Sequence, residues 1–362
     1  MKKIILSIIT FLILTICTSC GKETSLFYRY EYNGYLDTLG YIIVEYDTDD
    51  YSQTEVSNIL SKVEELLLNI EKEFSISQTI YMEEAGIEES TLMLINKRSG
   101  EKIATKVSDD FLELLSISQN MSNNTNGLFD VSIGSLTKVW NISSRAELCM
   151  DDSVLLEDIC SIPSDEEINT ALELVNYQDI QIDYDNKTVL LPKKGMALDF
   201  GGIAKGFAVE KIAEYLQTYK FSYAVINMGG NVKITGEVKQ DTDPLRIYVK
   251  NPFGEGNIGY YYPIVNTGGV TSGIYERYIS YKGKKYHHIL NPKTGYPSGD
   301  TVVSVTIMGE NSAMADALST GVFMMGLDRG LELINSLDGY EAIIITKEEK
   351  VYVSNNLDFI KN

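Results

Sequence analysis

The chain contains two histidines, and they are adjacent, at His287 and His288. A turn rich in glycine and proline follows them directly. A neutral imidazole is the usual general base near neutral pH, so this pair is the first candidate for chemistry. In an extended segment neighbouring side chains point to opposite faces, so we expect one histidine to act on a ligand and the other to be structural. The alternative is a histidine that is satisfied in the core.

A carboxylate and a hydroxyl, Asp316 and Thr320, lie four residues apart in the segment 313–325, whose small and apolar residues predict a helix. Residues at this spacing share one helical face. Oxygen ligands of this kind, completed by waters and ligand phosphates, suit Mg²⁺ better than zinc, with Mn²⁺ as a substitute. The alternative is that Asp316 only complements the positive end of the helix dipole.

Three glycine-containing segments carry further polar groups. Residues 199–206 (DFGGIAKG) lie between a predicted strand and a predicted helix, where free N–H groups favour a phosphate. Residues 227–231 (NMGGN) favour a hairpin turn with positive φ, although their amides would also suit a planar ligand. Residues 271–273 (TSG) precede the arginine at 277. Taken alone, the first two segments also fit ordinary turns.

The elements that must position these residues are mixed in type. Apolar spacing predicts helices over 56–74, 109–120, a capped segment from 164, 203–216 and 313–325. Alternation predicts strands over 41–46, 180–183, 188–191, 223–227, 232–236, 245–250, 261–266, 275–281 and 302–308. Local hairpins mingle with helices in no strict βαβ order, which predicts an α+β fold in two lobes or one enlarged body.

The N-terminus has the layout of a secretory signal over residues 1–19: two lysines, an apolar run too short to span a bilayer comfortably, and small residues. Residues 18–21 (TSCG) resemble a bacterial lipobox, in which Cys20 carries the lipid, although Cys17 stands where the pattern prefers leucine. An uncleaved anchor and cleavage elsewhere are the alternatives. We expect an exported protein, anchored as a lipoprotein to the outer face of the cytoplasmic membrane, with residues 20–30 as the linker.

Composition narrows the partners. The formal charge is −20, which repels phosphate backbones and argues against nucleic acid as a partner. A hydrophobic fraction of 44% with 7 prolines indicates a folded protein. Cys149 and Cys160 are the only cysteines after Cys20, and the sequence leaves open whether they pair.

Taken together, the segments resemble the ApbE family. Residues 199–206, 227–231, 271–278 (TSGIYERY), 287–297 (HHILNPKTGYP) and 315–320 (ADALST) occur in that family's order and spacing. Residues 71–75 (EKEFS), 90–96 and 126–134 (NGLFDVSIG) resemble its earlier blocks. The resemblance covers about 35 to 350, and the chain is identified as a member of a family of exported FAD:protein FMN transferases that are often lipoproteins.

The resemblance implies a body related to the T-fold, with mixed sheets and helices in two lobes around the flavin site, over residues 31–356. It implies Mg²⁺-dependent transfer of FMN from FAD to a Thr or Ser hydroxyl of an acceptor flavoprotein, with AMP released. It places the general base on His288 and the metal on Asp316, Thr320 and the Ala204 carbonyl. The expected FAD-binding residues are Ser90, Asn96, Asp130, Gly202, Lys205, Asn227, Gly229, Gly230, Thr271, Ser272, Gly273, Arg277 and His287.

Acceptor proteins with an FMN-binding domain, such as subunits of membrane redox complexes, are the implied partners. A sibling reaction, FAD hydrolysis to FMN and AMP, and a flavin-binding lipoprotein without activity are the alternatives. A pure binder needs no base, so the retention of His288 beside Asp316 and Thr320 argues against the second.

The chain also departs from the family pattern. Residues 129–132 (FDVS) replace Phe-Asp-Pro-Thr, Ser135 replaces a further proline, and Asn291 replaces the turn aspartate after the histidines. The stretch 140–162 lacks the glycine-rich continuation. We expect these changes to alter loop shape without removing the catalytic residues.

Overall fold

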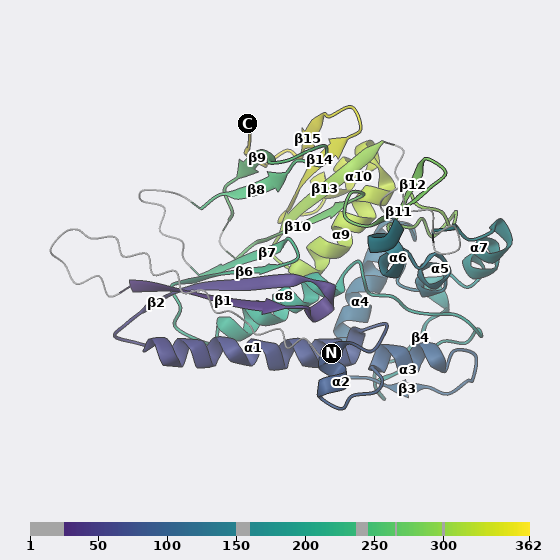
Figure 1. Cartoon of the computed structure of the whole chain (residues 1–362), viewed down its shortest axis with the longest axis horizontal. Helices are drawn as coiled ribbons and strands as arrows, with labels where there is room; N and C mark the ends of the chain where they lie inside the picture. The colour runs from purple at the N-terminus through teal and green to yellow at the C-terminus, as the bar shows by residue number, and fades with distance from the viewer. Residues whose placement is uncertain (1–24, 150–159, 237–244, 265, 299–300) are drawn as a thin grey trace.

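The computed structural model describes residues 25–149, 160–236, 245–264, 266–298 and 301–362 (Figure 1). The expected signal segment and Cys20 lie outside these residues. Within them, no helix is both long and apolar enough to cross a bilayer.

An eight-stranded sheet organises the molecule, and each neighbouring pair of its strands is antiparallel. In spatial order the strands are β1 (Ser25–Asn33), β2 (Leu39–Asp47), β6 (Tyr223–Met228), β7 (Asn231–Gly236), β10 (Gly268–Gly273), β13 (Val302–Gly309), β14 (Tyr340–Thr346) and β15 (Val351–Val353).

Three small sheets accompany the large one. They are β16 (Phe359–Lys361) with β9 (Asn257–Tyr261) and β8 (Ile247–Lys250), then β3 (Thr105–Lys106) with β5 (Thr188–Leu190) and β4 (Gln181–Asp183), and the hairpin β11 (Tyr278–Tyr281) with β12 (Lys284–His287). The helices are α1 (Gln53–Phe74), α2 (Ile80–Glu84), α3 (Thr91–Lys97), α4 (Asp109–Asn124), α5 (Gly134–Trp140), α6 (Ile142–Cys149), α7 (Asp165–Leu172), α8 (Ala204–Leu216), α9 (Ser312–Met325) and α10 (Leu327–Asn335). Two short 3₁₀ turns, η1 (Tyr35–Asp37) and η2 (Tyr177–Asp179), complete the described elements.

Alternation along β13 and β14 shows that both faces of the large sheet are covered there. Ile307 and Ile344 pack into the main core with the helices, whereas Met308, Ile343 and Ile345 pack with the small sheet of β8, β9 and β16. Because side chains alternate along a strand, burial on both faces needs a continuous apolar run. β13 is buried at each of its positions, so the large sheet is covered on both faces at this strand.

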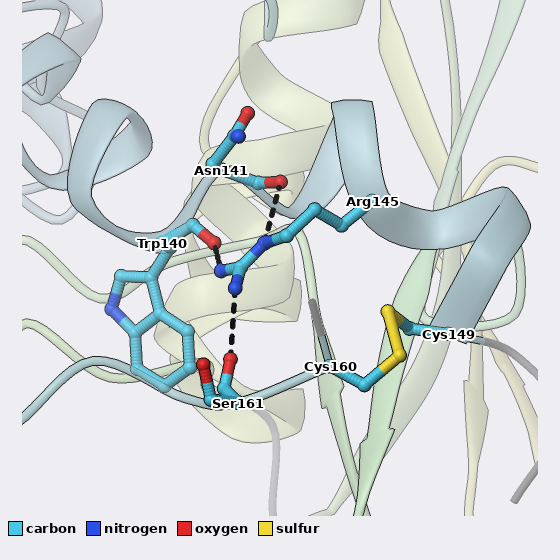
Figure 2. The surroundings of a disulfide bond; sticks show 6 residues. All are labelled: Trp140, Asn141, Arg145, Cys149, Cys160 and Ser161. Atoms are coloured by element: carbon cyan, nitrogen blue, oxygen red, sulfur yellow. Dashed lines mark hydrogen bonds between the residues drawn. A yellow bond between two sulfur atoms is a disulfide. The ribbon is translucent and has the colours of Figure 1, made fainter. Parts of the chain in front are cut away.

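A second, smaller core lies at the end of the molecule where α5, α6 and α7 gather around the β11–β12 hairpin (Figure 1). Trp140 is fully buried there, and its Nε1 donates to the Gly295 carbonyl over 2.7 Å. Cys149 and Cys160 form a disulfide, which answers the question that the sequence left open (Figure 2). Figure 2 also shows Arg145 donating to the carbonyls of Trp140, Asn141 and Ser161. The segment after α5 is therefore tied down by covalent and polar contacts.

The fold agrees with the predicted α+β class, with differences at several boundaries. Residues 25–33 form β1 of the large sheet, so the linker expected over 20–30 overlaps folded structure from Ser25 onward. At the other end β16 continues the fold beyond residue 356.

Two strand predictions were wrong in position, and one strand was not predicted. The strand predicted over 261–266 is β9, which ends at Tyr261 because its pairing with β8 and β16 fixes the register. The strand predicted over 275–281 begins only at Tyr278. Residues 271–273, predicted only as a ligand-binding motif, form the end of β10, where they pair with β13.

Candidate active site

The glycine turn before α8 is held by backbone contacts from distant segments. Asn96 pairs with both backbone groups of Leu198, at 2.7 and 2.9 Å, and Asp199 N donates to Val131 O over 2.8 Å. The Asp199 side chain then accepts from Gly201 N, which starts the turn into the helix. These contacts fix where α8 begins, at Ala204, and so place Lys205 and Gly206.

Asp316 lies on α9 with its carboxylate against the first turn of α8. Its Oδ2 accepts hydrogen bonds from Gly206 N at 2.8 Å and from the Asn231 side chain at 3.2 Å. The side chain is only 4% exposed. Burial raises the pKa of Asp316, while the charge of Lys205 and the two hydrogen bonds oppose that rise. A buried carboxylate held by neutral donors is a fitting partner for a cation.

The other predicted oxygen donors converge on the same place. Thr320 Oγ1 lies 3.3 Å from Ser272 Oγ of β10, and Ser272 also contacts Ser319 at 2.7 Å. A Cβ added at Gly202 would lie 3.3 Å from Thr320 Oγ1, so the glycine turn passes directly over this hydroxyl. The structure therefore brings together Asp316, Thr320, Ser272 and the turn before α8, as the sequence predicted.

The described residues contain no group of three or more His, Cys, Asp or Glu side chains arranged to hold a metal ion. The predicted set is of another kind, because it combines one carboxylate with a hydroxyl and a backbone carbonyl. Such a set suits a hard cation whose shell is completed by ligand phosphates and waters.

The segment 227–231 forms the predicted hairpin turn. β6 and β7 pair up to Met228 and Asn231, and the two residues between them, Gly229 and Gly230, have φ values of 58° and 90°. These angles are those of a type I′ turn, which glycine adopts without strain. Asn227 accepts from Gly230 N within the turn, while Asn231 points to Asp316. Asn231, at the end of this turn, is therefore one residue of the candidate site.

The β11–β12 hairpin brings the two histidines into different surroundings. His287 is buried, its ring lies edge-on to Phe323 at 5.9 Å, and its Nδ1 accepts from Ile289 N over 3.2 Å. Burial lowers the pKa of His287 to about 4. These contacts are with the protein, so the predicted binding of FAD by His287 stays a prediction and its observed role is packing.

His288 is partly exposed, and its Nδ1 lies 3.2 Å from the carbonyl oxygen of Arg277. A carbonyl can only accept, so Nδ1 carries the proton and Nε2 is left with a free lone pair in the neutral ring. Burial lowers the pKa of His288 to about 4, and the positive charges of Lys205 and Arg277 act in the same direction. His288 is therefore a neutral imidazole at physiological pH.

Lys205 acts electrostatically on both parts of the site, the one around Asp316 and the one around His288. Its charge acts on Asp316 and on His288, so it lies within electrostatic reach of both. Arg277 lies on the histidine side, where its Nη2 approaches the Asp37 carbonyl at 3.5 Å. The carboxylate beside it in sequence, Glu276, interacts with Lys205 and Arg277 and was not among the predicted site residues. Its proximity could not be read from the sequence, because it depends on where α8 begins.

Other predicted FAD ligands make their observed contacts with the protein itself. Ser90 is 1% exposed and caps α3 while donating to Ser75 O. Asp130 accepts from Ser132 and from Tyr177 N, and Thr271 bonds Thr306. Asn96 supports the glycine turn as described above. The structure shows these residues as supports, and direct contact with FAD stays a prediction for each.

The departures from the family pattern are compensated locally. Ser132 donates its hydroxyl to Asp130 at 2.6 Å, and Ser135 donates to Ala171 O at 2.9 Å. Asn291 accepts from Lys293 N at 2.7 Å through its side chain, which an aspartate would do equally well. The turn that follows the histidines is therefore intact.

Comparisons with known proteins show the family of the chain. A sequence model of the ApbE family matches residues 42–344. A FAD:protein FMN transferase of Klebsiella pneumoniae (strain 342) is 32% identical over 268 residues, covering 74% of this chain and 78% of that protein. A FAD:protein FMN transferase of Treponema pallidum (strain Nichols) is 26% identical over 317 residues, covering 84% and 82%.

Solved structures are similar over nearly the whole length. The crystal structure of an ApbE protein from Thermotoga maritima matches with a TM-score of 0.74 at 28% identity, covering 91% of this chain and 97% of that one. The flavin transferase ApbE from Vibrio cholerae also has a TM-score of 0.74, at 23% identity, where the likeness concerns the fold. The region that the family model matches contains both Asp316 and His288.

Proposed function

The chain belongs to the ApbE family, and from this premise we propose that it transfers FMN from FAD to a Thr or Ser hydroxyl of an acceptor protein and releases AMP. The observation that carries the proposal is the meeting of Asp316 and Thr320 on α9, Ser272 on β10 and the glycine turn before α8, with His288 within electrostatic reach of Lys205. Phosphoryl transfer needs charge neutralisation and alignment more than covalent help, and this arrangement offers both.

We propose that Mg²⁺, or Mn²⁺ in its place, is held by Asp316, Thr320 and the Ala204 carbonyl. The buried, raised-pKa carboxylate supports this assignment because it gains most from a cation. When bound, the ion would supply charge neutralisation to the pyrophosphate of FAD. The glycine turn before α8 and the side chain of Lys205 would orient the phosphates beside it.

His288 is proposed as the general base. Its Nε2 would take the proton of the acceptor hydroxyl as that oxygen attacks the phosphorus of the FMN phosphate. The new bond joins the acceptor oxygen to this phosphorus, and the bond to the bridging oxygen breaks, so that AMP leaves with the electron pair. The Arg277 carbonyl holds the ring in the tautomer that the step requires.

One assay separates the proposal from its alternatives. The protein would be incubated with FAD, Mg²⁺ and a flavin-acceptor domain, and the products followed by in-gel flavin fluorescence and by AMP release. Fluorescent acceptor together with AMP supports FMN transfer. Free FMN and AMP without labelled acceptor would indicate FAD hydrolysis, and bound but unreacted FAD would indicate a flavin-binding protein.

We further propose that the mature protein is exported and attached to the outer face of the cytoplasmic membrane through a lipid on Cys20. The support is the sequence of residues 1–21. Cys20→Ser should prevent lipidation and release the protein from the membrane fraction. A wild-type N-terminus that is cleaved elsewhere and carries no lipid, as seen by mass spectrometry, would contradict this. Acceptor subunits of membrane redox complexes would then be within reach.

A further inference from the structure

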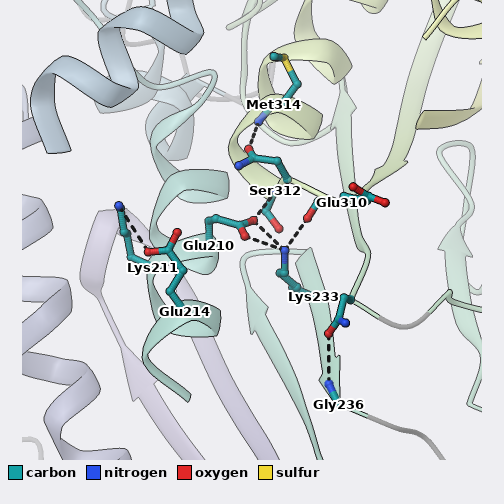
Figure 3. A network of polar contacts seen from close by, with 10 residues as sticks. Glu210, Lys211, Glu214, Lys233, Gly236, Glu310, Ser312 and Met314 are labelled. Atoms are coloured by element: carbon teal, nitrogen blue, oxygen red, sulfur yellow. Dashed lines mark hydrogen bonds and ion pairs between the residues drawn. The ribbon is translucent and has the colours of Figure 1, made fainter. Parts of the chain in front are cut away.

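A buried ion pair joins α8, β7 and the start of α9 (Figure 3). Lys233 Nζ lies 2.8 Å from both carboxylate oxygens of Glu210 and 2.6 Å from the Glu310 carbonyl, so each of its three protons has an acceptor. Glu210 Oε2 also accepts from Ser312 N at 2.7 Å, in the first turn of α9. The side chains of Lys233 and Glu210 are 3% and 14% exposed.

The same two helices are joined a second time, at the candidate metal site. Gly206 N donates to Asp316 Oδ2. Gly206 and Glu210 are four residues apart on α8, and Ser312 and Asp316 are four residues apart on α9. The two hydrogen bonds are therefore one helical turn apart on both helices, which run antiparallel in a register fixed at two points.

The contact between these helices leaves no room for adjustment at Gly206. A Cβ there would lie 2.2 Å from the Ser312 carbonyl oxygen and 2.6 Å from Asp316 Cβ. A shift of α9 along α8 would therefore carry Asp316 and Thr320 away from the turn before α8. The position of the oxygen donors depends on the start of α9 being held.

Stability alone does not account for a charged pair at this place. Exchanging a buried ion pair for apolar residues is often neutral or stabilising, because desolvation offsets the attraction. Glu210 and Lys233 do something that apolar residues cannot, since they hold one N–H and one carbonyl at the N-terminal end of α9. Asn311 completes this end by accepting from Met314 N.

We propose that Glu210 and Lys233 are positioning residues for the cation site, because they fix the register in which Asp316 and Thr320 lie against the start of α8 and the glycine turn before it. The inference rests on the proposed function, in which Asp316, Thr320 and the Ala204 carbonyl hold the metal. Loss of either charge should weaken metal binding without removing any metal ligand.

The test measures Mn²⁺ binding directly, by the EPR signal of free Mn²⁺ during titration of the metal-free full chain. Lys233→Met and Glu210→Met should each raise the dissociation constant about 10- to 100-fold, as loss of outer-shell partners does elsewhere. Glu210→Gln should be milder, because it keeps an oxygen for Ser312 N. Lys211→Met is the matched control. Lys211 also lies on α8, but it pairs with Glu113, at 2.8 Å, and not with the start of α9. The Mn²⁺ dissociation constant of this variant should therefore stay within about twofold of the wild-type value.

A double variant, Lys233→Met with Glu210→Met, separates positioning from stability. It leaves no unpaired buried charge, so its melting temperature should recover relative to either single variant. Its Mn²⁺ affinity should stay low, because Ser312 N and Glu310 O have still lost their partners. Recovery of affinity together with melting temperature, or single variants that bind Mn²⁺ like the wild type, would overturn the inference. Wild-type protein that binds no Mn²⁺ would overturn the proposed function as well.

Discussion

The two halves of the candidate site are held by different means. The half that contains Asp316 is built where α8 and α9 pack on the central strands, and its polar groups are fixed by buried hydrogen bonds inside the main core. The half that contains His288 is built on the two-stranded β11–β12 hairpin, which ends one residue before His288 and is marginally stable by itself. It is supported from outside, by the small core around Trp140, which includes the disulfide-bonded Cys149 and Cys160.

This difference matches the tasks proposed for the halves. Metal ligands must keep their geometry to a fraction of an ångström, and a rigid core provides that. A base has to meet an acceptor protein that arrives from outside, and His288 directly follows the β11–β12 hairpin, which lies near one end of the molecule (Figure 1). Perturbations of the small core should therefore affect the base and leave the metal site unchanged.

The largest expected effect comes from breaking the metal half. Asp316→Ala should lower the rate of FMN transfer by about 1,000-fold or more, since the charge stabilisation by a metal is worth several kcal/mol. Mn²⁺ titration would measure the loss of metal binding, and transfer assays would measure the loss of rate. Asp328→Ala, at an exposed position at the start of α10, is the control. An Asp316→Ala variant with near-wild-type rates in EDTA would show that the metal assignment is wrong.

The next-largest effect should come from removing the proposed base. His288→Ala should lower transfer by about 100- to 10,000-fold, the usual contribution of a general base. FAD affinity, measured by fluorescence quenching, should change little, because the base acts on the acceptor hydroxyl. His287→Ala is the paired variant and should cost less, through packing against Phe323. The reverse order of the two variants would transfer the role of base to His287.

Removing the disulfide tests whether the metal half and the base half of the site are held independently. Cys149→Ser with Cys160→Ser should lower the free energy of unfolding by about 2–4 kcal/mol, because the closed loop restricts the unfolded chain. The transfer rate should fall several-fold as the small core loosens, while the Mn²⁺ dissociation constant stays unchanged. Chemical denaturation, transfer assays and Mn²⁺ titration would be compared on the same preparation. Weakened Mn²⁺ binding in this variant would contradict the separation of the halves.

The smallest effect is the pH dependence. The folded pKa of His288 is about 4, below the ordinary value of 6.5, so the base stays neutral well into the acid range. The acid limb of kcat/KM should therefore lie near pH 4 in the wild type. Both histidines also favour folding fully above pH 6.5, and this contribution is lost as pH falls from 6.5 through 4. An acid limb near pH 6.5 would show that His288 is not the desolvated base.

Much of the site could be predicted because its signals are local. The spacing of Asp316 and Thr320 places them on one helical face, and the glycine pair at 229 and 230 specifies its own turn. The different surroundings of the two histidines were predicted from the alternation of an extended segment, but β12 ends at His287, so they arise where the strand stops. Each of these predictions needs only a few residues of context.

The missed features depend on pairing between distant segments. The strand that holds Ser272 is defined by its neighbours β7 and β13, not by its own residues, which are small and polar. The same applies to β1, whose place in the sheet comes from β2. Glu210 and Lys233 look like ordinary surface charges in the sequence, and only the packing of α8 on α9 buries them.

Cleavage of FAD should be coupled to labelling of an acceptor, because the reaction needs both the metal half and the base half of the site. The most direct measurement is the ratio of AMP released to FMN-bearing acceptor, with the acceptor followed by intact mass spectrometry. Wild-type protein should give one AMP for each labelled acceptor, in a metal-dependent reaction that Asp316→Ala and His288→Ala both slow strongly. Release of AMP from FAD while the acceptor stays unlabelled would contradict the account.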